Sequence, residues 1–179
     1  ACVNAVDMSK VNRIMDIGTG AGFPGVPLKI AFPHLEACLL DSLKKRVNFL
    51  EETFQLLKLE NITAIHGRAE EFAKNKAYRE TYDLCVSRAV SNLATLSEYC
   101  LPYVKTGGFF ISYKSGTVQE EVEQAQKAVK ILGGRIQDVV YFQLPDSEIQ
   151  RSLVVIEKVK ATPGRYPRKA GTPLKEPLS

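Results

Sequence analysis

The segment Met15-Asp-Ile-Gly-Thr-Gly-Ala-Gly-Phe-Pro-Gly25 joins a short apolar run to a helical pattern that starts near Pro24. Glycine has no Cβ, so Gly18, Gly20 and Gly22 let the backbone turn sharply and approach a ligand closely. A second apolar run ends at Asp41, and an acid about 20 residues beyond such a loop can bind both hydroxyls of a ribose. The pattern therefore predicts a strand, a glycine turn and a helix that bind a nucleotide-type ligand.

Asp16 separates two classes of ligand. The stretch from Gly20 to Gly25 fits the G-x-G-x-x-G dinucleotide pattern, but a carboxylate two residues before Gly18 would repel the pyrophosphate of NAD at the helix N-terminus. S-adenosylmethionine carries a ribose, an ammonium and a sulfonium and has no phosphate, so its cationic amino acid would favour Asp16. We therefore expect S-adenosylmethionine, with NAD and a ligand-free structural turn as the alternatives.

Composition is that of an ordinary globular domain. The 179 residues are enough for one domain with a sizeable core, and 45% are apolar and 25% charged. We find no apolar run of membrane-spanning length and no signal-peptide pattern, so we expect a cytoplasmic protein that does not enter a membrane. Four scattered cysteines and two histidines, with no C-x-x-C, predict reduced core thiols and no metal site. Nothing in the sequence requires more than a monomer.

Short apolar runs alternate with helical patterns along the chain. We expect strands at 13–17, 36–41, 61–66, 82–87, 108–113, 136–144 and 152–159, and helices at 25–32, 44–57, 69–73, 92–101 and 117–132. Strand–helix repeats imply a parallel sheet covered by helices on both faces, and the last two strands should pair antiparallel. The predicted fold class is α/β, a Rossmann-like seven-stranded sheet with a C-terminal antiparallel hairpin over residues 1–160, as in class I S-adenosylmethionine-dependent methyltransferases. The ligand should lie at the carboxyl ends of the strands.

The segment 161–179 differs in composition from the rest of the chain. It contains four prolines and carries a net charge of +3, from four basic residues and Glu176. Because proline at this density argues against a helix or a central strand, we expect an extended basic tail. The tail is either a disordered terminus or an arm that contacts phosphates, and Tyr166 between two arginines weakly supports the arm.

Longer motifs resemble those of one family. They are Asp16-Ile-Gly-Thr-Gly-Ala-Gly-Phe-Pro-Gly25, Asp41-Ser-Leu-Lys-Lys-Arg-Val-Asn-Phe-Leu50, Arg68-Ala-Glu70, Ser87-Arg-Ala-Val90 and Tyr166-Pro-Arg-Lys-Ala-Gly-Thr-Pro173. From about Val11 to its C-terminus the chain resembles the bacterial small-subunit (16S) ribosomal RNA guanine-N7 methyltransferases, the glucose-inhibited division protein B family. The glycine motif alone fits many methyltransferases, whereas Gly-Phe-Pro-Gly, Asp-Ser-x-x-Lys-Arg and Pro-Arg-Lys-x-Gly-Thr-Pro together are specific. Family members usually carry an additional N-terminal helical segment, of which little precedes the first strand here.

The resemblance implies a function and a set of cofactor contacts. The implied reaction transfers a methyl group from S-adenosylmethionine to N7 of a guanosine in 16S ribosomal RNA. Asp41 would accept hydrogen bonds from the ribose, the backbone near Leu43 and Ala69 would frame the adenine, and Arg88 would meet the cofactor carboxylate or an RNA phosphate. Glu70 and Arg88 have alternative roles as a first-turn helix acid and a surface ion-pair partner. With the loop glycines, the expected cofactor-binding residues are Gly18, Gly20, Gly22, Phe23, Asp41, Ser42, Leu43, Ala69, Glu70 and Arg88.

Guanine N7 carries a lone pair and no proton, so it can attack the sulfonium methyl directly and catalysis reduces to alignment. We therefore expect no catalytic acid or base and name no catalytic residue. The expected RNA-binding residues, each with a solvated surface charge as its alternative, are Lys114, Arg151, Arg165, Arg168, Lys169 and Lys175. Competing functions are a class I methyltransferase with another substrate, an NAD-dependent oxidoreductase and a non-catalytic RNA-binding domain. The sequence leaves open which nucleotide is modified, and whether naked RNA or the assembled subunit is the substrate.

Overall fold

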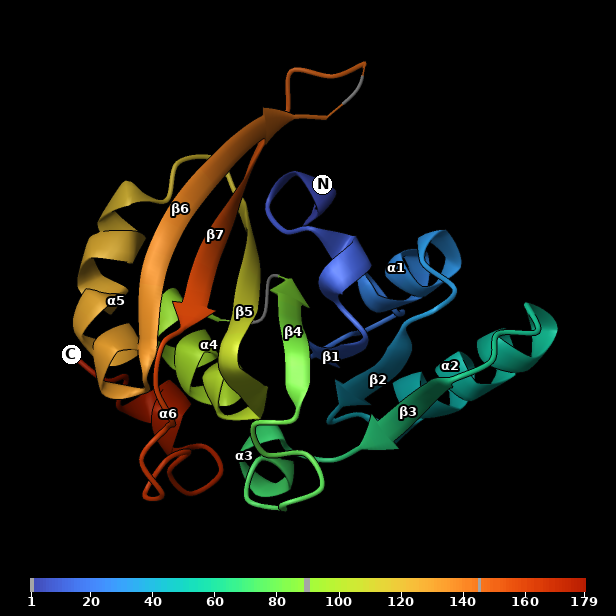
Figure 1. The fold of residues 1–179 in the computed structure, drawn as a ribbon, viewed down its shortest axis with the longest axis horizontal. Helices are drawn as coiled ribbons and strands as arrows, with labels where there is room; N and C mark the ends of the chain where they lie inside the picture. The colour runs from blue at the N-terminus through green and yellow to red at the C-terminus, as the bar shows by residue number, and fades with distance from the viewer. Residues whose placement is uncertain (1, 89–90, 145) are drawn as a thin grey trace.

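Seven strands of the described residues form one sheet in the order β3-β2-β1-β4-β5-β7-β6 (Figure 1). The structure is a computed structural model that describes residues 2–88, 91–144 and 146–179. The strands are β1 (Arg13–Ile17), β2 (Glu36–Asp41), β3 (Ile62–His66), β4 (Tyr82–Arg88), β5 (Val104–Ser115), β6 (Gly134–Gln143) and β7 (Gln150–Lys158). The helices are α1 (Gly25–Ala31), α2 (Lys44–Leu56), α3 (Ala69–Phe72), α4 (Leu93–Cys100), α5 (Gln119–Ile131) and α6 (Thr172–Lys175), with 3₁₀ turns η1 (Cys2–Asn4), η2 (Met8–Lys10) and η3 (Leu101–Tyr103).

The pairing confirms the predicted α/β fold. Strands β1 to β5 pair in parallel, and β7 pairs antiparallel with both β5 and β6. The main difference from the predicted boundaries is in β5, which begins at Val104 rather than at Gly108. Tyr82 pairs with Val104 and Leu84 with Phe109, so the Gly107-Gly108 pair lies in an irregular part of the strand and does not precede it. The strand order reverses between β1 and β4, where α/β folds bind their ligands.

Alternate residues of the strands pack on opposite faces of the sheet, as the two-residue period of a strand requires. On one face Met15 and Cys85 pack with residues of α4 and α5. On the other face Ile14 and Leu39 pack with residues of α1 and α2. All four cysteines are buried, which confirms their expected place in the core. Among the helices that the structure describes, we find none with the length and apolar character needed to cross a bilayer.

The carboxylate of Asp16 holds the glycine loop to the start of α1. Its Oδ2 accepts hydrogen bonds from Thr19 Oγ1 at 2.7 Å and from the backbone N–H of Gly25 at 2.8 Å. Gly25 is the first residue of α1, so its N–H has no partner within the helix and favours a negative charge. A Cβ at Gly25 would lie 2.9 Å from Leu39 Cγ, so only glycine lets the helix approach β2 this closely.

Residues 161–179 fold back onto the domain. The expectation that their prolines exclude a helix is wrong for α6, because Pro173 lies in its first turn, where a missing N–H costs nothing. Tyr166, Thr162 and Pro173 are buried. Arg79 also donates hydrogen bonds to the carbonyls of Tyr166 and Thr162, at 2.9 and 2.8 Å. The segment is therefore a packed part of the domain surface in this structure.

Asp16 gives the stability of the domain a specific pH dependence. Burial raises the pKa of its carboxyl from 3.8 to about 6. The folded chain therefore binds this proton more tightly than the unfolded chain, and the resulting stabilisation is complete below about pH 4 and lost as the pH rises through 6. We expect this component of the free energy of unfolding to be about 3 kcal/mol in the native chain and absent in Asp16→Asn. Urea denaturation of both proteins from pH 4 to pH 8 measures the difference, and parallel pH profiles would contradict the prediction.

Candidate functional site

A cavity of about 1470 Å³ opens at the carboxyl ends of β1, β2, β4 and β5. It lies at the point where the strand order reverses, so the loops that follow these strands form its walls. The sequence predicted a ligand site at this edge of the sheet. Of the predicted site residues, those that line the cavity are Gly18, Gly20, Phe23, Asp41, Ser42, Arg88, Lys114 and Arg151.

The glycine loop after β1 forms one wall, and its backbone requires glycine. Gly18, Gly20 and Gly22 have φ angles of 68°, 62° and 94°, in the left-handed region that disfavours other residues. A Cβ on Gly20 would meet nothing within 4 Å, so its backbone is open to a ligand. A Cβ on Gly22 would lie 2.6 Å from Val26 and 2.9 Å from Leu50, so the structure uses Gly22 to pack the loop on α1 and α2.

Asp41 ties the second loop to the first. Its Oδ2 accepts hydrogen bonds from Gly20 N at 2.9 Å and Arg46 Nη1 at 3.2 Å, and its Oδ1 accepts one from Leu43 N at 2.9 Å. A carboxylate offers about four lone-pair positions, so one remains for a ligand hydroxyl. The Arg46 side chain is half exposed and can move away to free another. Sequence reasoning missed Arg46, although the Asp-Ser-x-x-Lys-Arg motif contains it.

Asp16, in contrast, does not reach the cavity. The carboxylate is fully buried beneath the glycine loop, and its hydrogen bonds go to Thr19 and Gly25. Asp16 therefore makes no direct contact with the cavity, and the expectation that it favours a cationic ligand stays a prediction. Asp16 contributes to the site by fixing the glycine loop, because Thr19 of the loop and Gly25 of α1 both donate hydrogen bonds to its Oδ2.

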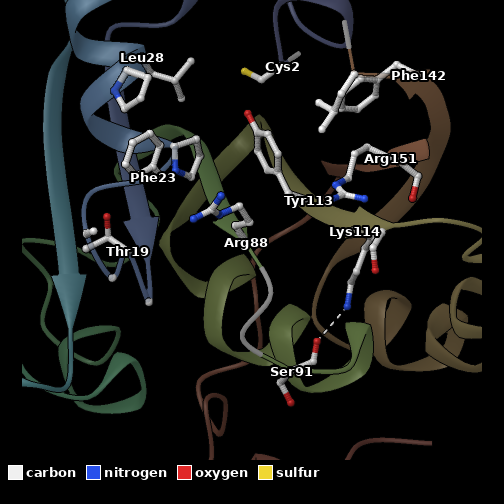
Figure 2. Close-up of a pocket in the computed structure, with 18 of the residues that line it drawn as sticks. Cys2, Thr19, Phe23, Leu28, Arg88, Ser91, Tyr113, Lys114, Phe142 and Arg151 are labelled. Carbon is white, nitrogen blue, oxygen red and sulfur yellow. Dashed lines mark hydrogen bonds between the residues drawn. The ribbon is translucent and has the colours of Figure 1, made fainter. Parts of the chain in front are cut away.

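Arg88 and Phe23 lie next to one another at the cavity (Figure 2). The guanidinium carbon of Arg88 lies 5.5 Å from the centre of the Phe23 ring, within range of a cation–π interaction. Phe23 is 48% exposed, so much of its ring is available to a ligand. Ser87 holds the end of β4 against β1 by donating a hydrogen bond to the Ile17 carbonyl at 2.8 Å. The last two residues of the predicted Ser87–Val90 motif lie outside the described residues.

Four of the predicted cofactor-binding residues are not among the described residues that line the cavity: Gly22, Leu43, Ala69 and Glu70. Leu43 contributes its backbone N–H to Asp41. The Ala69 carbonyl accepts a hydrogen bond from Tyr103 Oη at 2.7 Å, and the buried Glu70 carboxylate accepts one from Gly171 N at 2.8 Å. The structure thus places Ala69 and Glu70 in α3, outside the set of residues that line the cavity, and cofactor contact by these residues stays a prediction.

Two of the six expected RNA-binding cations have carboxylate partners. Lys114 Nζ lies 2.6 Å from Glu121 Oε1 and also donates to the Ser91 carbonyl (Figure 2). Arg168 pairs with Glu98, which is fully buried. Both charges already have a carboxylate partner, and RNA contact by these two residues stays a prediction. Arg151 lines the cavity, whereas three cations are exposed on the tail: Arg165, Lys169 and Lys175.

One wall of the cavity was not predicted from the sequence. It is apolar and comes from η1, α1 and the end of β6, with Cys2, Val3, Leu28, Phe32 and Phe142. Figure 2 shows the Tyr113 hydroxyl directed toward Cys2 on this side. These residues are far apart in the sequence and form no motif, so only the fold brings them together.

Comparison with known proteins agrees with this geometry. Residues 1–154 match the family model GidB, described as rRNA small subunit methyltransferase G. The ribosomal RNA small subunit methyltransferase G of Lachnoclostridium phytofermentans is 57% identical over 93% of this chain and 69% of its own length. The corresponding protein of Clostridium novyi is 53% identical over 96% of this chain and 70% of its own length.

Solved structures share the fold at low sequence identity. The StiE O-MT structure aligns with a TM-score of 0.69 at 18% identity, over 90% of this chain and 72% of that one. An O-methyltransferase from a trans-AT PKS multienzyme of Brevibacillus brevis, in complex with S-adenosyl-L-homocysteine, aligns with a TM-score of 0.64 at 13% identity, over 87% and 69%. From the family match and the identity to its relatives, the chain belongs to the GidB family, rRNA small subunit methyltransferase G.

Proposed function

We propose that this protein transfers the methyl group of S-adenosylmethionine to N7 of a guanosine in small-subunit ribosomal RNA. Membership in a family of that name supports the substrate class. The observation that best supports S-adenosylmethionine as the cofactor is the cavity at the point where the strand order reverses, which is lined by Gly18, Gly20, Asp41 and Arg88. A ribosomal RNA substrate would place the activity in the cytoplasm, and a cavity formed by one chain requires no second subunit.

The residues present fit this cofactor. Asp41 keeps a lone-pair position for a ribose hydroxyl, and the open backbone at Gly20 lets the ligand approach. The exposed guanidinium of Arg88 can bind the carboxylate of the cofactor's amino acid. When bound, S-adenosylmethionine supplies an electrophilic methyl group on a sulfonium. The absence of phosphate from this ligand suits a glycine loop whose helix N-terminus already holds the Asp16 carboxylate.

Alignment is the main task that the reaction sets for the protein. Guanine N7 has no proton to lose, and its lone pair forms the new bond as the carbon–sulfur bond breaks. No general base is required, which agrees with a cavity whose acids, Asp41 and Glu121, are committed to hydrogen bonds. The exposed ring of Phe23 offers a face for the guanine, whose positive charge grows during transfer. The target base must leave its stack to reach the cavity.

The ribose contact is tested by two substitutions of one residue. Asp41→Asn keeps an acceptor oxygen and loses the charge, whereas Asp41→Ala loses every hydrogen bond of the side chain. We expect S-adenosylhomocysteine to bind about 10-fold more weakly to the first and at least about 100-fold more weakly to the second, because a charged hydrogen bond contributes a few kcal/mol. Titration calorimetry measures both, with Asp138→Asn on the exposed side of β6 as the control. Unaltered affinity would show that the ribose lies elsewhere, and binding of NAD by the native chain would overturn the cofactor.

The exposed cations of the tail are expected to contact RNA phosphates. Replacing Arg165, Lys169 and Lys175 together with glutamine removes three exposed charges and leaves the buried Glu98–Arg168 pair intact. We expect weaker binding to small-subunit RNA and a salt dependence of the binding constant that is smaller by roughly one logarithmic unit per lost phosphate contact. Filter binding at several salt concentrations measures the slope. A slope equal to that of the native protein would reject the role of the tail in RNA binding.

A further inference from the structure

The C-terminal clamp, defined here as residues 166–173, is anchored by a carboxylate in the interior of the protein. Glu98 of α4 is fully buried. Its Oε1 accepts hydrogen bonds from Arg168 N at 2.7 Å and Arg168 Nε at 3.0 Å, and its Oε2 accepts one from Arg168 Nη2 at 2.7 Å. A buried carboxylate without a partner is strongly unfavourable, so this ion pair holds the clamp in one place.

From this anchor the clamp reaches α3. The backbone N–H of Gly171 donates to Glu70 Oε1 at 2.8 Å, and the Glu70 side chain is buried at the contact. Gly171 has a φ of 85°, a left-handed conformation that suits glycine and turns the chain toward α3. Thr95 of α4 donates a hydrogen bond to the Pro173 carbonyl at 3.0 Å and fixes the far end. The two acids, Glu70 of α3 and Glu98 of α4, are therefore bridged by the four clamp residues 168–171.

Helix α3 is in turn connected to the ribose-binding loop. It follows β3 directly, and β3 pairs with β2, whose last residue is Asp41. The Gly67 N–H donates to the Asp41 carbonyl at 3.0 Å, and His66 Nε2 lies 3.2 Å from the Ser42 carbonyl. Since α3 has only four residues, its own backbone hydrogen bonds fix it weakly, and its position depends on contacts such as that of Glu70 with the clamp.

We propose that Arg168 and Gly171 are positioning residues for the cofactor, which hold α3 through Glu70 and thereby fix the turn between β3 and α3 that is hydrogen-bonded to the Asp41 loop. The proposal rests on the proposed function, since it assigns to the clamp an effect on S-adenosylmethionine binding. It also gives Glu70 a role as the acceptor for the clamp.

The test uses pairs of variants on the two sides of the contact. Arg168→Gln loosens the anchor, and Glu70→Ala removes the acceptor, whereas Glu70→Gln keeps an oxygen that can accept from Gly171. We expect S-adenosylhomocysteine to bind about 10-fold more weakly to the first two and nearly normally to Glu70→Gln. The double variant Arg168→Gln with Glu70→Ala should bind S-adenosylhomocysteine no more weakly than either single variant, because both substitutions interrupt the same connection between the clamp and α3. Lys127→Gln, at an exposed position of α5 and with the same loss of charge, is the matched control.

Calorimetry gives the affinities, and hydrogen exchange of the amides at 166–175 reports whether the clamp is released. With small-subunit RNA as substrate, the KM for S-adenosylmethionine should rise while kcat at saturating cofactor changes less than about threefold. If Arg168→Gln does not fold because Glu98 is left unpaired, Glu98→Gln with Arg168→Gln removes that charge and takes its place. Normal affinity in a variant with a released clamp overturns the proposal, as does a Glu70→Gln variant as weak as Glu70→Ala. Failure of the native chain to bind S-adenosylhomocysteine would instead overturn the proposed function.

Discussion

A single carboxylate oxygen organises the ligand-binding edge of the sheet. Oδ2 of Asp16 accepts hydrogen bonds from Thr19 in the glycine loop and from the first N–H of α1, so strand, loop and helix meet at one buried atom. The cost is a buried charge, partly balanced by the helix N-terminus and by Arg88. Asp41 repeats the arrangement one strand away, by binding Gly20 N and Leu43 N. These two acids fix the positions of the loops at the cavity through hydrogen bonds.

The fold could be predicted from the sequence because its signals are local. Apolar alternation and helical periodicity identified β1 and β2 with their observed ends, and the missing crossover before β7 identified the antiparallel hairpin. Two errors have physical causes. The strand expected to begin at Gly108 begins at Val104, because Gly107 and Gly108 form an irregularity inside it. The prolines after residue 160 indicated an extended tail, although Pro173 lies in the first turn of a helix.

Within the site, the sequence identified residue types better than their partners. Gly20, Asp41 and Arg88 lie at the cavity because loops after parallel strands must converge there. No pattern could show that Lys114 pairs with Glu121, or Arg168 with Glu98, because those partners come from other elements. The apolar wall around Phe142 depends in the same way on the tertiary fold. The number of basic residues in the tail is therefore larger than the number of tail cations without a carboxylate partner, because Arg168 is paired with Glu98.

The position of β7 also bears on how the chain reaches this structure. β7 lies between β5 and β6, although it is the last of the strands to be synthesised. On the ribosome, β5 therefore has a free edge and β6 has no partner until residues 150–158 emerge. Closing this part of the sheet requires β7 to insert between two waiting strands, a slow, non-local step during which both edges are open to other chains. Residues 161–179 leave the ribosome after β7, so the contacts of α3 with them form only after β7 has been synthesised.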